Sequence, residues 1–468
     1  MIYFIFNSLK LLKVSKIWLL GASLFFYGYW NIKYIPLILG SIVINYFCGL
    51  LLIRANNGTV CVRRKKIILI CGLIINIGLL GYFKYTNFFI ENINHITNQN
   101  LRLVQLVLPI GISFFTFTQI AYLVDAYRGF AKEYNFLNYS LFITFFPHLL
   151  AGPIIHHREM MPQFDRLRNK FVNYKNIAEG LYLFSIGLFK KVIIADTFSL
   201  WVDKGFQQVT PLSFLDAWAT SLSYTFQIYY DFSGYTDMAL GVALLFNIKL
   251  PINFNSPYRS LNIQEFWQKW HITLSRFLRE YIYIPLGGNR RKEIRVQVNL
   301  LTTFLIGAFW HGAGWMFIFW GLLHGTAIVF LRFWRKLNIS MPNVFAWFLT
   351  FNFINIAWIF FRAENWKVAR NILKGMFGLN DFILPFTLSD KLNFLKSFDF
   401  KFGLLGIFEK DFFLLMLLSL SLVLVFRNSN QIIGSFKPNW MNALFAGFLF
   451  ISSVLSLAKI KVFLYFNF

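Results

Sequence analysis

One histidine lies in the middle of a long uncharged stretch, where an ionisable side chain is unusual. His311 falls within residues 300–331, a run without aspartate, glutamate, lysine or arginine. Burial of an imidazole in lipid costs desolvation energy and favours its neutral form, which is the form that a general base requires. Gly312 and Gly314 remove side-chain bulk beside it and allow close helix packing or close approach of a substrate. Three alternatives stay open: a structural histidine, a catalytic base, or a ligand of a metal or haem.

A second histidine, His324, follows in the same run. It comes thirteen residues after His311, which is about 220° around an ideal helix. The two rings therefore point apart unless the helix breaks between Gly312 and Gly314, and a shared metal ion is disfavoured. The 3 cysteines of the chain also lack the spacing of a metal site, so we expect no bound metal.

Two aspartates follow the apolar stretch 217–230. Asp231 and Asp237 have Ser233 and Gly234 between them. Aspartates at membrane depth serve in other proteins as proton relays or cation ligands. Directly after an apolar run they are more typical of residues that anchor the start of a helix, and we predict a helix start here.

Charges spread along Ile263–Tyr283 predict an amphipathic helix at the membrane interface rather than a span. The segment is rich in Trp and Phe but also carries glutamate, lysine and arginine residues. Such a helix lies flat, with its apolar face in the lipid. Asn262, followed three residues later by Glu265, predicts a capping box at its start. His271 within this helix is typical of an aromatic belt at the interface.

The composition identifies the elements that must position these side chains as membrane helices. The chain has 468 residues, of which 57% are hydrophobic and 14% are charged. Ordinary soluble domains are roughly 45–50% apolar and about 25% charged, and disordered chains are poorer still in apolar residues. A span needs about 20 apolar residues, and the long apolar runs predict about eleven transmembrane helices in an all-α polytopic membrane protein. No cleavage site follows the shorter run Ile17–Trp30, so we expect a retained first helix rather than a signal peptide.

The charge balance is strongly positive, with 45 Lys and Arg against 20 Asp and Glu. Nucleic-acid binding is a common reason for such a balance, but the apolar runs argue against it. Basic loops fix the topology of inner-membrane proteins, and residues 10–16 and 63–66 predict cytoplasmic loops. Lys190 and Lys191 interrupt the apolar stretch 181–194. They either end a short helix and reach to the interface or line a vestibule that attracts a cytosolic anion.

Successive membrane spans should cross to opposite sides of the membrane, and residues 136–155 do not fit this rule. The run 103–124 brings the chain back to the cytoplasm, so residues 136–155 are expected to leave it, yet the basic residues of 158–175 follow. Pro147 and Pro153 lie inside the run. A broken or re-entrant segment that returns to the same side resolves the conflict. Such backbone is tolerated only where protein or a wet cavity surrounds it, so we expect a functional interior here.

Seven motifs occur in one order along the chain. They are Gly81–Tyr85, Leu108–Phe114, Phe146–Pro153, Asp231–Tyr235, Phe266–Ile272, Trp310–Gly312 and Phe361–Glu364. With these motifs the sequence resembles the membrane-bound O-acyltransferase family, in the branch of the alginate O-acetylation proteins and the peptidoglycan O-acetyltransferases. Each motif alone is weak, but their combination is specific.

The resemblance implies a single integral membrane domain over residues 1–468, with a family-like core at about 20–370 and additional transmembrane helices at 371–468. The implied fold is a ring of tilted helices with re-entrant segments and a cytoplasmic funnel. The implied enzyme is an O-acyltransferase of the bacterial inner membrane. It takes an acetyl group from a cytosolic thioester and passes it across the membrane for O-acetylation of peptidoglycan or an alginate-like exopolysaccharide. D-alanyl transfer to polymers like teichoic acid, and a transporter or flippase of an envelope precursor, are the alternatives.

The resemblance also implies roles for individual residues. It places the family's invariant histidine at His311 and the second histidine of the branch at His271, both as catalytic residues. The segment Leu286–Arg290 resembles the acetylating members, which favours acetyl-CoA as the donor and no permanently bound cofactor. The basic residues expected to hold this anionic donor are Lys190, Lys191, Arg290 and Arg291. The candidates for lining a substrate channel are His148, Asp231, Ser233, Trp310 and His324.

The implied chemistry is acyl transfer to a hydroxyl group. His311 is expected to act as the general base, with His271 or protein dipoles stabilising the oxyanion. A covalent acyl-histidine stays open as an alternative. The expected partners are the lipid bilayer, the acyl thioester and a separate periplasmic O-acetyltransferase related to esterases.

Overall fold

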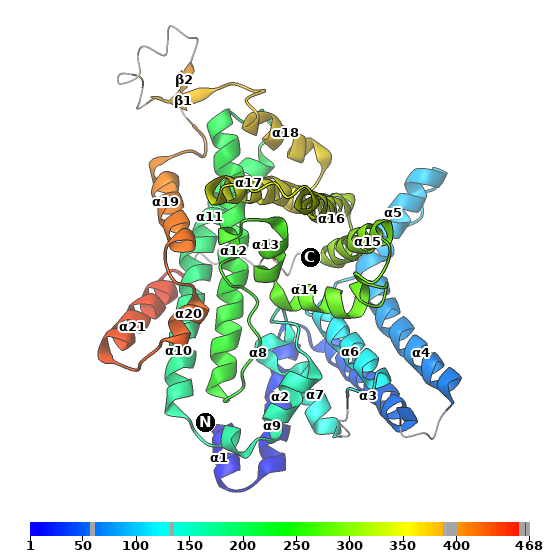
Figure 1. Ribbon diagram of the computed structural model, residues 1–468. Coiled ribbons are helices and arrows are strands. Elements are labelled where there is room, and N and C mark those ends of the chain that lie inside the picture. Colours follow the sequence, from blue (N-terminus) through cyan, green and yellow to red (C-terminus); the bar gives the residue numbers. More distant parts are fainter. Residues whose placement is uncertain are drawn as a thin grey trace.

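Helices make up most of the structure, a computed structural model that describes residues 1–56, 61–131, 135–386, 389, 401–403, 405–457 and 464. The only strands within these residues form one short parallel pair, β1 (Ile383–Pro385) with β2 (Lys401–Gly403). The all-α class is therefore confirmed (Figure 1). By length and composition, four helical stretches of the described chain can cross a membrane: 32–54, 62–97, 315–336 and 343–362. The larger number of spans and the cytoplasmic funnel stay predictions.

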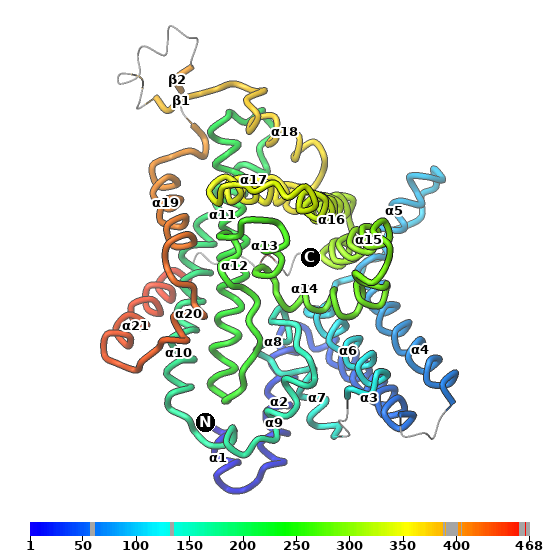
Figure 2. The backbone as a smooth tube through the Cα atoms, viewed as in Figure 1, coloured from blue at the N-terminus to red at the C-terminus, as the bar shows by residue number. Residues whose placement is uncertain are grey.

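The described residues of the N-terminal part form six α-helices, besides short 3₁₀ and π turns. They are α1 (Ile2–Ser8), α2 (Leu12–Trp30), α3 (Ile35–Arg54), α4 (Val62–Leu80), α5 (Thr86–Thr97) and α6 (Ile112–Tyr127). Both α3 and α4 pack against α6, and Figure 2 shows these three from blue to cyan in the lower right of the molecule. The apolar run Ile17–Trp30 forms most of α2, which follows α1 and is not among the four stretches above. The retention of this run as a membrane helix stays a prediction.

The predicted break in residues 136–155 is present. The segment forms α7 (Phe136–Thr144) and α8 (Phe146–Leu149), and the chain then continues to α9 (His157–Asp165). Pro147 occupies the first turn of α8, where its missing N–H costs nothing, while Phe145 before it leaves the helical conformation. Figure 1 shows α7 and α9 on the same side of α8, so the chain turns back on itself there.

The predicted helix start at Asp231 and Asp237 is wrong. Both aspartates lie inside α12 (Phe214–Leu245), a continuous helix of 32 residues. Helix α12 packs along α10 (Tyr174–Phe189), which a π-helical turn at 190–195 joins to α11 (Asp196–Gln207). A Cβ on Gly187 would lie 2.5 Å from the carbonyl oxygen of Gly234, so the two glycines let these helices approach closely.

The predicted interfacial helix over Ile263–Tyr283 is also wrong as a single element. The segment forms α13 (Ile263–Lys269) and α14 (Ile272–Leu278), and a π-helical turn at 279–283 follows. Figure 1 shows both helices between α12 and the helices that carry the later histidines. Trp270 and His271 at the break are buried, so neither belongs to an aromatic belt at the interface.

The capping box at the start of α13 is confirmed in part. The Asn262 side chain accepts the backbone N–H of Glu265 at 2.9 Å, as predicted. The Glu265 carboxylate reaches back one residue further than expected and accepts the N–H of Leu261 at 2.8 Å. The cap therefore satisfies two backbone donors at the helix start.

The remaining helices lie after residue 292, and the chain leaves the helical conformation between His311 and Trp315. They are α15 (Glu293–His311), α16 (Trp315–Lys336), α17 (Asn343–Arg362), α18 (Trp366–Met376), α19 (Lys410–Leu424), α20 (Ser429–Gly434) and α21 (Trp440–Leu455). Helices α15 and α16 pack against each other, and α17 packs on both α16 and α12. His311 and His324 therefore lie on two packed helices rather than on one.

Candidate active site

His311 is the last residue of α15, and a lysine from another element holds this helix end. Lys84, in the π-helical turn Gly81–Tyr85, donates from Nζ to the carbonyl oxygens of Trp310 at 2.6 Å and His311 at 3.1 Å. Carbonyl groups in the last turn of a helix lack partners within the helix, and a cation there also interacts favourably with the helix dipole. Lys84 thus fixes the position of His311, a role that the motif Gly81–Tyr85 did not reveal in the sequence.

The structure brings His271 and His311 together. Their ring centroids lie 6.4 Å apart. His271 occupies the junction between α13 and α14 in the left-handed region, with a φ of 43°. Such a φ is uncommon for a residue with a side chain, and residues held this way concentrate at functional sites. Both rings are buried, with exposed fractions of 0% for His271 and 4% for His311.

Aromatic side chains enclose His311. Ring centroids lie 4.9 Å away for Trp310, 5.2 Å for Phe361 and 5.5 Å for Trp320. Walls of this kind exclude water and strengthen every electrostatic interaction inside the site. The site therefore has dry surroundings, in which a reactive group is protected from hydrolysis.

The Asn253 side chain determines which nitrogen of His271 carries the hydrogen. Asn253 Oδ1 accepts the hydroxyl of Thr273 at 2.7 Å and its backbone N–H at 3.3 Å. A backbone N–H can only donate, so the atom facing Thr273 must be the amide oxygen. His271 Nδ1 lies 3.3 Å from the same oxygen and therefore carries the ring hydrogen. The neutral ring then presents a lone pair at Nε2. In this tautomer the ring offers an acceptor at Nε2, and stabilisation of an oxyanion by His271 stays a prediction that requires the doubly protonated ring.

Replacement of Asn253 by Ala is expected to lower kcat for acyl transfer by about 10- to 100-fold, the cost of about one to two lost hydrogen bonds to a site residue. Without the amide oxygen, the His271 ring loses the acceptor that sets its tautomer. Steady-state kinetics of the purified protein measure the effect. Asn253→Asp keeps an acceptor oxygen and is expected to retain more activity than Asn253→Ala. Wild-type kcat in Asn253→Ala contradicts this positioning role.

Of the predicted channel residues, Trp310 and His324 lie near His311. His324 Nδ1 accepts the indole N–H of Trp267 at 3.2 Å, and its ring centroid is 4.8 Å from that of Trp320. The Trp320 ring thus contacts both His311 and His324, which places His324 one ring away from His311. His148 belongs to the broken segment instead, where its Nε2 lies 3.1 Å from the carbonyl oxygen of Phe142. Whether these residues line a channel stays a prediction.

Lys190 and Lys191 are engaged in buried ion pairs. Lys191 Nζ lies 2.6 Å from Asp231 and 2.7 Å from Asp196. Lys190 Nζ lies 2.7 Å from Asp237 and 2.6 Å from the Ser429 hydroxyl. Because carboxylates already neutralise both lysines, we correct the expectation that they hold an anionic donor. The same pairs explain how two aspartates are tolerated inside α12.

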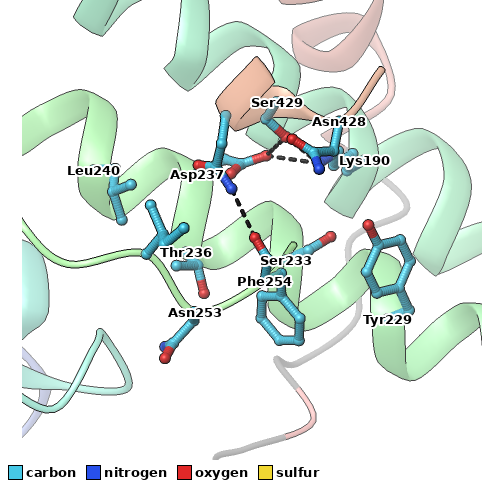
Figure 3. Close-up of a pocket in the computed structure, with 12 residues that line it drawn as sticks. Lys190, Tyr229, Ser233, Thr236, Asp237, Leu240, Asn253, Phe254, Asn428 and Ser429 are labelled. Carbon is cyan, nitrogen blue, oxygen red and sulfur yellow. Dashed lines mark hydrogen bonds and ion pairs between the residues drawn. The ribbon is translucent and has the colours of Figure 1, made fainter. Parts of the chain in front are cut away.

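Ser233 lies beside these ion pairs in a small polar cavity (Figure 3). The cavity has room for about one water molecule, and Ser233, Asp237, Asn253 and Ser429 are among its lining residues. Asn253 therefore lies between this cavity and His271. Arg290 and Arg291 are exposed in the turn after residues 279–283, and their role toward a donor stays a prediction.

Comparisons with known proteins agree with this arrangement of motifs. The family model "MBOAT, membrane-bound O-acyltransferase family" matches residues 62–365. The peptidoglycan O-acetyltransferase of Helicobacter pylori is 49% identical over 97% of this chain and 91% of its own length. The Pseudomonas aeruginosa protein named "Probable alginate O-acetylase AlgI" is 40% identical over 77% of this chain and 69% of its own. The teichoic acid D-alanyltransferase of Bacillus subtilis is more distant, at 28% identity over 54% of this chain and 69% of its own.

The family match extends from α4 through α17, and so includes both histidines and the lysine that holds α15. It supports acyl transfer rather than a transporter or flippase. The chain is a multi-pass membrane protein and an acyltransferase, and it belongs to the membrane-bound O-acyltransferase family.

Proposed function

We propose that this protein takes an acetyl group from cytosolic acetyl-CoA and passes it across the bacterial inner membrane for O-acetylation of peptidoglycan. The similarity to the Helicobacter pylori peptidoglycan O-acetyltransferase, which extends over 97% of this chain, supports this acceptor most strongly. A separate periplasmic protein related to esterases is the proposed partner that completes the transfer onto the polysaccharide.

The pair of buried histidines carries the proposed mechanism. His311 accepts the proton of an acceptor hydroxyl as its oxygen attacks the thioester carbonyl. The new C–O bond forms, the C–S bond breaks, and the proton passes from His311 to the departing thiolate. His271, with its lone pair at Nε2, offers a second acceptor that orients the attacking hydroxyl. The aromatic rings of Trp310, Trp320 and Phe361 surround this step and keep water out.

The experiment that tests this function uses acetyl-CoA labelled in the acetyl group. Membranes that contain the protein and its periplasmic partner receive the label together with either peptidoglycan fragments or alginate. We expect O-acetylated peptidoglycan and little acetylated alginate. Labelled alginate in place of peptidoglycan contradicts the acceptor, and no product from acetyl-CoA with either polymer contradicts the donor.

A further inference from the structure

A second hollow lies against α9, and Figure 1 shows α9 at the same end of the molecule as α1, α2 and α7. Its volume is about 640 Å³. Its lining includes Phe130, His157, Arg158, Met161, Asp165 and Arg166, and we name it the α9 groove. Basic segments at 10–16 and 158–175 belong to this end of the fold, which the distribution of charge predicts to face the cytoplasm.

The α9 groove has a positive charge that carboxylates do not cancel. Asp165 pairs with the nearly buried Lys16. Glu159, beside the groove, accepts both terminal nitrogens of Arg276 at 2.5 and 3.0 Å. Arg158 and Arg166 form no ion pair with a carboxylate among the residues that the structure describes. Two exposed guanidinium groups are therefore available to an anion.

An aromatic face accompanies these arginines. The guanidinium carbon of Arg158 lies 5.2 Å from the ring centroid of Phe130, whose side chain is 52% exposed. Arginine recognises phosphate with two parallel hydrogen bonds, and a flat aromatic or guanidinium surface stacks on a nucleobase. The combination fits a nucleotide with phosphate groups better than a simple carboxylate.

One lining residue of the groove, His157, contacts helix α6, and the other end of α6 contacts the active site. His157 Nδ1 lies 3.3 Å from Asp125 Oδ2, and Asp125 is in the last turn of α6. At the other end of α6, the Ser113 carbonyl oxygen accepts the indole N–H of Trp310 at 3.4 Å. Twelve residues of helix separate Ser113 from Asp125, a distance of about 18 Å. An extended pantetheine arm, which joins the phosphates of CoA to its thioester, spans a distance of this order.

A row of aromatic rings in contact with one another also extends from the active site toward the groove. Trp310 lies against Phe117 at 5.0 Å between centroids, and Phe117 stacks on Phe277 at 4.1 Å. Phe277 then contacts Tyr281 at 4.9 Å, and the Tyr281 hydroxyl lies 3.1 Å from His156 Nδ1, next to the groove. Between Trp310 and Tyr281 the side chains are thus aromatic rings, which suit an uncharged arm better than its phosphates.

We propose that the α9 groove binds the phosphate groups of the acyl-CoA donor through Arg158 and Arg166. This inference rests on the proposed function. The α9 groove takes the place of Lys190 and Lys191 as the expected binding site of the donor phosphates. It assigns the nucleotide end of the donor to the groove and the thioester to the histidine pair.

The test compares two donors with the full-length protein in nanodiscs. Acetyl-CoA carries the nucleotide phosphates, whereas acetyl-pantetheine lacks them. We expect the ratio of kcat/KM for the two donors to fall by about 30-fold in Arg158→Gln/Arg166→Gln, because two charge-assisted contacts are lost. Arg168→Gln, the same charge change at an exposed neighbour outside the groove, is expected to change the ratio less than about twofold. A general loss of folding lowers kcat/KM for both donors alike and leaves the ratio unchanged, which contradicts the proposal.

Calorimetric binding of CoA, without turnover, separates this inference from the proposed function. A Kd for CoA that is about 30-fold higher in the double variant than in wild type supports the groove, even where acetyl transfer itself fails. Equal Kd values in the two proteins contradict it. Nanodiscs with and without anionic phosphatidylglycerol test a lipid head group as the source of the phosphate. If the double variant loses only its dependence on anionic lipid and keeps the wild-type Kd for CoA, the groove binds lipid and the proposal is overturned.

Discussion

Replacement of His311 by Ala is expected to abolish acyl transfer nearly completely, with a fall in kcat of about 10²- to 10⁴-fold, the usual contribution of a general base. His311 is enclosed by aromatic rings, lies 6.4 Å from His271 between centroids, and is 4% exposed. Of the two buried rings, His311 is assigned to take the proton of the attacking hydroxyl, and His271 to orient that hydroxyl. Initial rates with labelled acetyl-CoA and the purified protein measure the loss.

Two controls accompany this experiment. His95→Ala removes an exposed histidine of α5 and is expected to leave the rate unchanged. His311→Gln keeps most of the side-chain volume but lacks a basic nitrogen, and is expected to be as inactive as His311→Ala. If His311→Gln retains wild-type activity, the ring only fills space and the assignment as base is wrong.

Replacement of Lys191 by Met is expected to have the largest effect on stability, a loss of about 3–5 kcal/mol in the free energy of unfolding. The substitution leaves Asp196 and Asp231 without their cation, and both carboxylates lie within 2.7 Å of Lys191 Nζ. The exposed fractions of the side chains are 4% for Asp196 and 1% for Asp231, so water does not take the place of the lysine. The midpoint of unfolding in detergent, by heat or denaturant, measures the change.

Lys175→Met is the matched control, because Lys175 lies on α10, which leads into the turn that contains Lys191. Lys175 pairs with Glu179 at 3.8 Å, but its side chain is 67% exposed, and exposed pairs contribute about 0–1 kcal/mol. Addition of Asp231→Asn to Lys191→Met removes one of the two stranded charges and is expected to restore part of the stability. A Lys191→Met protein as stable as the Lys175→Met protein contradicts the buried charge cluster.

The features that could be predicted from the sequence are those encoded by local chemistry. Long apolar runs identify membrane helices because lipid requires them, and Pro147 predicts the break before α8 because proline cannot continue a helix. The cap at Asn262 depends only on the residues beside it. The burial of His311 follows from its place in an uncharged run. Its partner His271 was identified only by resemblance to known sequences.

The features that could not be predicted depend on contacts between distant segments. Asp231 and Asp237 are tolerated inside α12 because Lys191 and Lys190 face them from a neighbouring helix. No local pattern encodes that pairing. The left-handed turn at His271 contains no glycine that would predict it. The sequence of residues 263–283 therefore predicts one amphipathic helix instead of two. The α9 groove likewise combines Phe130 with residues of α9, and these lie together only in the folded chain.

The central claim is that this chain passes an acetyl group from the cytoplasmic side to an acceptor on the other side by chemistry at His311. The most direct measurement uses sealed vesicles that contain the protein and its periplasmic partner, with labelled acetyl-CoA on the cytoplasmic side and peptidoglycan fragments on the other. We predict labelled peptidoglycan with wild-type protein and none with His311→Ala. Equal labelling by His311→Ala, or labelling only when donor and acceptor share one side, would contradict the claim.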